Sequence, residues 1–147
     1  MPLVYLDNCA LQRPLDDRVP FRVRVEAEAI EAVIREVERG SVDLLTSDVL
    51  VAESTAATDP TRRDFAAETL GLAASSVPLT REIEDRAGLY EDVGIKAVDA
   101  LHLASAVEGA ADYFCTTDDR FFVKASGANT VAVRIVTPSE LAIALGL

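Results

Sequence analysis

The amino-acid sequence predicts an α/β protein built on a parallel β-sheet. Short apolar runs alternate along the chain with longer segments in which apolar residues recur every three or four positions. Strands and helices that alternate in this way usually form one layered domain with a parallel sheet. The chain has 147 residues, half of them hydrophobic, which is enough for one core. Since no repeat, low-complexity segment or linker interrupts it, we expect residues 1–147 to form a single domain.

The first half of the chain is expected to supply three strands. Residues 3–6 are a nearly unbroken apolar run typical of a central parallel strand, and residues 42–46 and 75–79 are two further short strands. A proline-containing loop at residues 14–20 follows the first strand. The first helix expected here is residues 25–37, which Gly40 closes. The second is capped by Ser47 and carries Val49, Leu50 and Glu53 on one face. The third is residues 61–74, with Phe65, Leu70 and Leu72 as core candidates.

The second half continues the same alternation. Residues 80–93 are expected to form a helix that Gly94 stops, and residues 98–108 a second helix that ends at Gly109. Residues 113–116 are a short buried strand that leads into an acidic loop. Residues 131–136 form the last strand, and the Thr-Pro-Ser-Glu segment at 137–140 is a capping box that starts a terminal helix.

Composition limits the function. The formal net charge is −11, with 25 acidic and 14 basic residues, which argues against a general nucleic-acid coat protein because such binding depends on basic residues. No apolar run approaches the roughly 20 residues that span a bilayer, and the N-terminus does not resemble a signal peptide, so we expect a cytoplasmic protein with no membrane partner. Cys9 and Cys115 lack metal-ligand spacing and are expected to be free thiols. One histidine excludes mechanisms that need several imidazoles.

Four carboxylates are the candidate functional residues. Asp7 follows the first strand, Glu53 lies in the helix after the second, Asp99 begins a late helix, and Asp118 follows the fourth strand. Because the carboxyl ends of parallel strands meet at one edge of the sheet, Asp7, Asp99 and Asp118 are expected at that edge. Glu53 joins them only if its helix packs beside it.

Each of these acids also has a purely structural interpretation. Asp99 and Asp118 suit the positive end of a helix, an effect worth about 0.3–1 kcal/mol. Asp7 suits a turn, and Glu53 suits a solvated helix face. Taken together, clustered carboxylates repel one another unless a cation lies between them. Mg²⁺ and Mn²⁺ prefer oxygen ligands, and such a site can activate water for attack on a phosphate without any histidine.

These residues resemble those of the PIN-domain family, and they are most similar to the VapC-type ribonuclease toxins of toxin–antitoxin pairs and their unpaired relatives. The matching segments are Val-Tyr-Leu-Asp at 4–7, residues 47–53, Val-Asp-Ala-Leu-His-Leu-Ala at 98–104, and Cys-Thr-Thr-Asp-Asp-Arg-Phe at 115–121. The resemblance implies a parallel sheet with helices on both faces and a Mg²⁺- or Mn²⁺-dependent RNA endonuclease. It places the catalytic and metal-binding acids at Asp7, Glu53, Asp99 and Asp118, with Asp119 as an alternative to Asp118.

The resemblance also implies partners. The substrate would be RNA, and a toxin of a type II pair would bind a cognate antitoxin protein; an unpaired member and a homodimer are both left open. Arg13, Arg18, Arg22 and Arg24 form the densest basic group and are candidates to bind RNA phosphates. They are equally suited to surface ion pairs with Asp16, Asp17, Glu26 and Glu28. His102 invites a general-base role, although a packed or hydrogen-bonded histidine is the favoured interpretation.

Two other functions compete. The first is an aspartyl phosphotransferase, which would use Asp7 as nucleophile. Dehalogenase-like phosphatases have a second aspartate two residues later, where this chain has Cys9. A phospho-receiver domain would have a lysine after the last strand, and this region offers only Arg134. The other is a non-catalytic binding module that keeps the PIN fold. The intact acidic set argues against such a module, whereas the acidity of the chain favours it.

Overall fold

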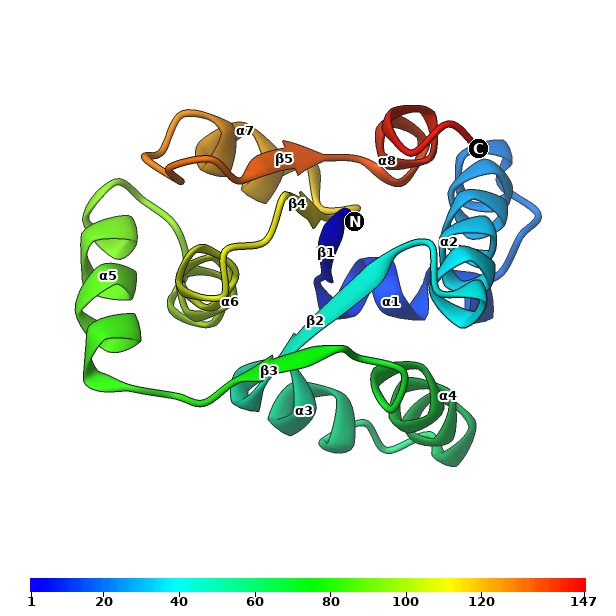
Figure 1. Ribbon diagram of the computed structural model, residues 1–147, viewed down its shortest axis with the longest axis horizontal. Coiled ribbons are helices and arrows are strands. Elements are labelled where there is room, and N and C mark those ends of the chain that lie inside the picture. Colours follow the sequence, from blue (N-terminus) through cyan, green and yellow to red (C-terminus); the bar gives the residue numbers. More distant parts are fainter.

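The computed structural model describes all residues from 1 to 147, and at its centre lies a five-stranded, wholly parallel sheet (Figure 1). The strand order is β3-β2-β1-β4-β5, with β1 in the middle. The bounds of the strands are Leu3–Leu6 for β1, Asp43–Ser47 for β2, Ser75–Val77 for β3, Tyr113–Cys115 for β4 and Arg134–Val136 for β5. The expected α/β architecture with a parallel sheet is therefore confirmed.

Helices cover both faces of this sheet (Figure 1). On one side α5 lies outside α6, and on the other α2 packs against α8, with α1 beside it. α3 and α4 pack against each other near β3, at one end of the sheet. The helix bounds are α1 Asn8–Gln12, α2 Phe21–Arg39, α3 Asp48–Thr55, α4 Pro60–Leu70, α5 Arg81–Asp92, α6 Ala97–Glu108, α7 Asp119–Ser126 and α8 Pro138–Ala144, with a 3-10 turn at Arg13–Leu15.

None of these helices combines the length and the apolar composition that crossing a membrane requires.

The register of the central strands places their carboxyl ends side by side. Tyr5 pairs with Leu45 of β2 and with Phe114 of β4, and Leu6 pairs with Cys115. All five side chains are 1 % exposed or less, as expected of parallel strands buried on both faces. The segments that leave β1, β2 and β4 therefore start from the same edge of the sheet.

Two segments expected as turn or loop are helices instead. Asp7 caps α1, its Oδ1 accepting a hydrogen bond from the Ala10 amide at 3.1 Å, and Asp118 caps α7 in the same way through the Phe121 amide at 3.1 Å. Both helices are short, with five and eight residues, so they offer little periodic signal in the sequence. Each acid therefore sets the position of the helix that follows it.

Three further expectations differ in detail. α2 begins at Phe21, four residues before the apolar stripe starts. The last strand begins at Arg134, because Val131 adopts φ +57°, a left-handed conformation that a strand does not allow. Leu72, expected in the core, is 41 % exposed, because α4 ends at Leu70.

Gly109 ends α6 for a reason other than backbone freedom. Its conformation is right-handed, with φ −78°, so any residue could adopt it. A Cβ at this position, however, would lie 2.8 Å from Val77 Cγ2 and would overlap the Leu45 side chain. Leu45 is almost fully buried and cannot easily move away. The glycine therefore allows the end of α6 to approach β2 and β3 closely.

Gly109→Ala is expected to destabilise the protein by about 1–3 kcal/mol, because the added methyl group overpacks the contact with Leu45 and Val77. Gly88→Ala is the matched control, since Gly88 lies within α5 and nothing is within 4 Å of its Cβ position. That substitution should stabilise the helix by about 0.5–1 kcal/mol. Urea unfolding of both variants measures the two effects, and equal shifts would contradict the packing argument.

Candidate functional site

The structure brings the four candidate carboxylates to the carboxyl edge of the sheet. Asp7 follows β1, Glu53 lies in α3 after β2, and Asp118 lies between β4 and α7. Asp99, in the first turn of α6, lines one cavity together with Asp118. The charges of Asp118 and Glu53 both raise the pKa of Asp99, and those of Asp7 and Glu53 both act on Tyr5. Asp99 is thus affected by Asp118 and Glu53 directly, whereas Asp7 is related to Glu53 through Tyr5.

Asp7 is the most buried member, with 7 % of its surface exposed. Its Oδ1 accepts hydrogen bonds from the Cys9 thiol at 2.8 Å and from the Ala10 amide at 3.1 Å. Burial raises the pKa of the Asp7 carboxyl above its ordinary value, and these hydrogen bonds oppose that rise because they favour the charged form. The carboxylate is therefore fixed in place and costly to keep charged.

Asp99 is half-buried and forms neither a hydrogen bond nor an ion pair through its side chain. Burial is the largest cause of its raised pKa, followed by repulsion from the Asp118 charge, and Glu53 adds to it. Lys96 acts in the opposite direction without removing the rise. A charged group that lacks a partner and faces other charges of the same sign is a ready ligand for a cation.

Asp118 and Asp119 have different surroundings. Asp118 uses Oδ1 to cap α7 and lines the same cavity as Asp99. Asp119 instead receives two hydrogen bonds from Arg22, at 2.8 and 2.9 Å, and this guanidinium lowers the pKa of its carboxyl. The geometry therefore favours Asp118 over Asp119 as the member of the acidic set.

Glu53 is tied to the core by a chain of buried hydrogen bonds. Its Oε1 lies 3.1 Å from His102 Nε2, and Nδ1 of the same imidazole lies 2.7 Å from the Tyr5 hydroxyl. That hydroxyl is also 2.7 Å from Ser47 Oγ. The same Oγ accepts a hydrogen bond from the Leu50 amide and so caps α3. His102 is only 2 % exposed, so it is a hydrogen-bonded core residue that orients Glu53.

The direction of these hydrogen bonds follows from the chemistry of the groups. An ionised Glu53 carboxylate only accepts, so His102 Nε2 carries a proton and donates it. In the neutral imidazole Nδ1 then accepts from the Tyr5 hydroxyl, which in turn accepts from Ser47. Burial raises the pKa of the Tyr5 phenol far above its ordinary value, so this donor stays protonated. Sequence analysis missed the role of Tyr5, because its signal was that of an ordinary strand residue.

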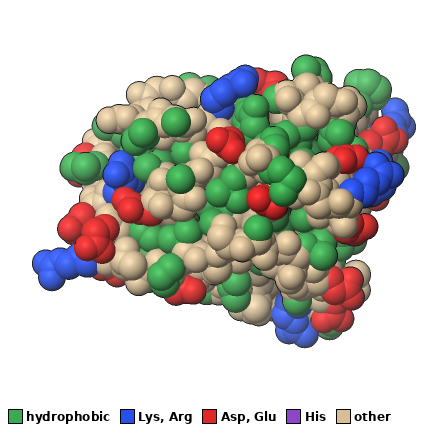
Figure 2. All heavy atoms as spheres, viewed as in Figure 1, with side chains coloured by type: hydrophobic (Ala, Val, Ile, Leu, Met, Phe, Trp, Pro, Cys, Tyr) green, Lys and Arg blue, Asp and Glu red, His purple; other side chains and the backbone are tan.

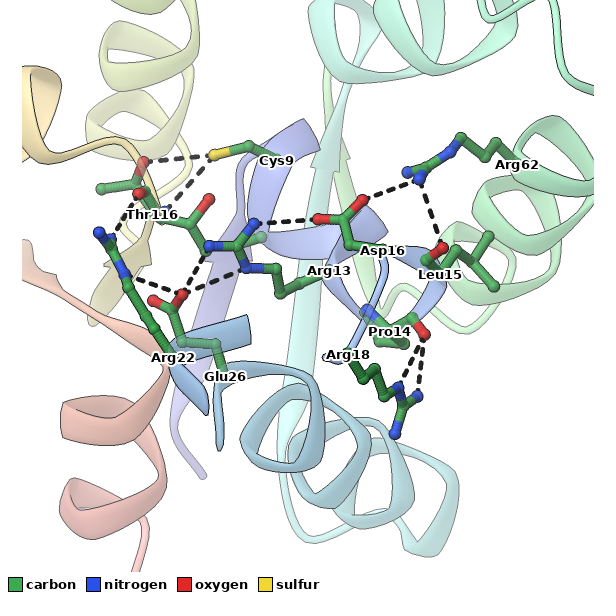
Figure 3. Close-up of polar contacts among 12 residues, drawn as sticks. Cys9, Arg13, Pro14, Leu15, Asp16, Arg18, Arg22, Glu26, Arg62 and Thr116 are labelled. Carbon is green, nitrogen blue, oxygen red and sulfur yellow. Dashed lines mark hydrogen bonds and ion pairs between the residues drawn. The ribbon is translucent and has the colours of Figure 1, made fainter. Parts of the chain in front are cut away.

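Three of the four candidate RNA-binding arginines, namely Arg13, Arg18 and Arg22, already form polar contacts within the protein (Figure 3). Arg13 and Arg22 share Oε1 of the buried Glu26, at 2.7 and 3.2 Å. The remaining contacts join Arg13 to Asp16 at 3.0 Å, Arg22 to Asp119 at 2.8 Å, Arg18 to Glu31 at 2.9 Å, and Arg24 to the face of Phe21 at 5.5 Å from the ring centre. Arg13 and Arg22 thus form ion pairs of the kind that the sequence left as the alternative, with Asp16 and Glu26, whereas Arg18 pairs with Glu31, which was not among the expected partners.

Three basic residues outside that group lie next to the acids. Lys96, Arg120 and Lys124 line the cavity that contains Asp99 and Asp118. They come from the start of α6 and from α7, two segments that the sequence does not bring together. The only signal available from the sequence was that Lys96 precedes Asp99 by three residues.

The donor set fits a hard divalent cation by its chemistry. All four candidate ligands are carboxylates, and no cationic side chain lies within ion-pair distance of Asp99 or Asp118. No three His, Cys, Asp or Glu side chains are close enough together to hold one ion as they stand. The residues therefore match Mg²⁺ or Mn²⁺ in chemical type, and they would have to move closer together to bind one ion.

Comparisons with known proteins agree with this fold. The family model described as PIN domain matches residues 4–127. A chain in the crystal structure of VapBC2 from Rickettsia felis bound to a DNA fragment from their promoter superimposes with a TM-score of 0.59 at 11% sequence identity. The match covers 91% of this chain and 98% of that chain. No match was found among curated proteins.

Tyr5→Phe is expected to destabilise the fold by about 1–3 kcal/mol, because it leaves His102 Nδ1 buried without its partner. It should also weaken any activity that depends on Glu53, since the imidazole that holds Glu53 is no longer anchored. Tyr113→Phe is the matched control, because the Tyr113 hydroxyl makes no hydrogen bond in the structure. Thermal unfolding compares the two variants, and equal stability would disprove the role given to the Tyr5 hydroxyl.

Proposed function

The chain belongs to the PIN domain family, and from this we propose that it is a Mg²⁺- or Mn²⁺-dependent endoribonuclease that hydrolyses RNA phosphodiester bonds. The observation that carries the proposal is the Asp99 carboxylate, which is half-buried, has no hydrogen-bond partner and is repelled by Asp118 and Glu53. Its position in the first turn of α6 favours the charged form only weakly. A bound cation would favour that form more strongly.

Asp7, Glu53, Asp99 and Asp118 would hold the metal. When bound, the ion would lower the pKa of a water molecule and offset charge on the phosphate. Glu53 would be held for this purpose by His102, and Asp7 by its contacts with Cys9 and Ala10. Because Asp7 and Asp118 each cap a helix, the positions of these two acids are fixed by the backbone.

We further propose that the protein is the toxin of a type II toxin–antitoxin pair and acts in the cytoplasm. The similarity to a chain of VapBC2 supports this part of the proposal. So does the net charge of −11, because an acidic site suits a basic segment of a partner protein. Cys9 and Cys115 form no disulfide, which suits a reducing compartment.

The second candidate is a PIN-fold binding module without catalytic activity. One observation favours it: no three acidic, histidine or cysteine side chains are arranged closely enough to hold an ion. An aspartyl phosphotransferase is less consistent with the geometry, because Asp7 is almost buried and its Oδ1 already accepts two hydrogen bonds. Metal titration and RNA cleavage assays separate these functions.

Asp99→Asn is expected to abolish RNA cleavage and to remove the stabilisation of the protein by Mn²⁺. When a chelator is present, the variant should be more stable than wild type. The raised pKa means that the folded chain binds this proton more tightly than the unfolded chain, so stability falls as pH rises through that pKa. Asparagine removes the cost of keeping this carboxylate charged in the folded state. Because solvent screens the charge, the free energy of unfolding should rise by only about 0.3–1 kcal/mol, and the melting temperature by about 1–4 °C. The gain should disappear below about pH 4, where the carboxyl is protonated in both states.

Thermal unfolding of wild type and Asp99→Asn across pH, with chelator and with Mn²⁺, measures these changes, and cleavage of an RNA pool measures activity. Asp64→Asn is the control, because Asp64 is an exposed residue of α4 outside the site. Unchanged Mn²⁺ stabilisation in Asp99→Asn would remove this residue from the ligand set. Absence of cleavage by wild type with either metal would favour the binding module.

A cognate antitoxin is expected to co-purify with the chain and to inhibit cleavage. Its inhibiting segment should carry an arginine, because a guanidinium can pair with the carboxylates at the carboxyl edge of the sheet. Co-expression with the neighbouring reading frame, followed by size-exclusion chromatography, tests this. A chain that purifies alone and leaves growth unaffected when expressed would contradict the toxin assignment.

A further inference from the structure

A small cavity beside Asp99 and Asp118 has a basic rim. It measures about 80 Å³ and lies where α7 approaches the start of α6. Three cationic side chains line it, namely Lys96, Arg120 and Lys124, and these include both lysines of the chain. In a protein with 25 acidic and 14 basic residues, three cations around one cavity are a local reversal of charge.

No carboxylate lies within ion-pair distance of any of these three cations, unlike most of the arginines in residues 13–24. Lys124 donates a hydrogen bond to the carbonyl oxygen of Gly94 at 2.8 Å, which fixes its position and leaves its charge uncompensated. All three side chains are exposed and so accessible to a ligand. By contrast, Arg13, Arg18 and Arg22 already have carboxylate partners.

The charge balance of the cavity favours an anion. Three cations and two carboxylates leave a net charge of +1, and a divalent cation on the carboxylates would bring it to +3. The repulsion among these positive charges is relieved most directly by phosphate oxygens, which also accept the hydrogen bonds that lysine and arginine donate. Repulsion from the rest of the acidic chain makes such a local site necessary for any RNA contact.

The size of the cavity indicates which part of RNA it suits. The cavity is small, about 80 Å³, and most of its lining is charged side chains, which together suit a phosphate group better than an apolar stacked base. Figure 2 agrees with a local site, because on the face that it shows the Lys and Arg side chains lie separately around the margin and form no broad basic surface. Recognition here would therefore be of backbone rather than of base sequence.

We propose that Lys96, Arg120 and Lys124 form the phosphate-binding site for the RNA strand, adjacent to the carboxylates that act on the scissile bond. This inference rests on the proposed function, and it assigns the substrate contacts to α6 and α7 rather than to the arginines of residues 13–24. The cavity contains the two kinds of group that phosphodiester cleavage needs side by side: acids for the metal and cations for the neighbouring phosphate.

The test is RNA binding by the catalytically inactive Asp7→Asn chain with Mg²⁺ present, using a fluorescent single-stranded oligouridylate of about a dozen nucleotides. In that background, Lys96→Ala with Arg120→Ala and Lys124→Ala should lower affinity at least about tenfold. The slope of log K against log salt should fall by about 2, since each neutralised phosphate of a single strand contributes about 0.7. The charge-keeping set Lys96→Arg, Arg120→Lys and Lys124→Arg should restore binding to within about threefold.

The matched control removes three other exposed arginines that have no carboxylate partner, Arg35, Arg63 and Arg81, and that lie outside the cavity. It changes the net charge equally and should leave the salt slope almost unchanged. Circular dichroism and thermal unfolding establish that both triple variants fold. If the triple variant of the cavity unfolds, the double variant Lys96→Gln with Arg120→Gln replaces it in the binding assay. Both side chains are exposed, so these substitutions should not disturb the core.

The outcomes separate this inference from the proposed function. If wild type cleaves RNA while the cavity variant and the control bind alike, the phosphate site is overturned and the nuclease stands. If wild type cleaves no RNA yet the cavity variant alone loses binding, the phosphate-binding site is supported and the nuclease activity is overturned. If wild type cleaves no RNA and no variant, including the Asp7→Asn parent, binds RNA, both are overturned.

Discussion

The hydroxyl group of Tyr5 connects the core of this protein to its candidate site. The ring is fully buried in the central strand and stacks on Phe114 with 5.2 Å between ring centres. A buried hydroxyl without partners would cost several times what a satisfied one contributes, so its two hydrogen bonds are a condition for placing tyrosine here. Through them β1 is joined to the cap of α3 by Ser47 and to α6 by His102. The imidazole then orients Glu53, which makes the position of one candidate ligand a consequence of core packing.

The acids at the carboxyl edge illustrate a conflict between stability and function. Burial raises the pKa of both Asp7 and Asp99, so each is held charged at a cost to the folded state. For Asp7 part of that cost is offset because the same carboxylate caps α1. Asp99 caps no helix, and its position in the first turn of α6 and the nearby Lys96 favour its charge without removing the rise in its pKa. The residue that contributes least to stability is therefore the clearest functional candidate.

The sequence could predict the sheet and the acids because both depend on short, local signals. Apolar runs defined the strands, and the order of the motifs placed Asp7 and Asp118 where β1 and β4 end. It could not predict α1 and α7, which are too short to show a helical period. Nor could it show that Gly109 is required by the Leu45 side chain, a contact between residues 64 positions apart. Such contacts depend on tertiary packing, for which a single sequence holds no local pattern.

The basic residues show the same distinction in their electrostatics. Density along the sequence pointed to residues 13–24, but α2, which begins within this segment, also carries Glu26 and Glu31, and these acids pair with Arg13, Arg22 and Arg18. Cations that remain unpaired must be found by their position in space, and Lys96 and Lys124 are 28 residues apart in sequence while both line one cavity. In a chain with a net charge of −11, the total says little about where a polyanion can bind. What decides where a polyanion can bind is where cations without a carboxylate partner gather, and three of them line the cavity beside Asp99 and Asp118.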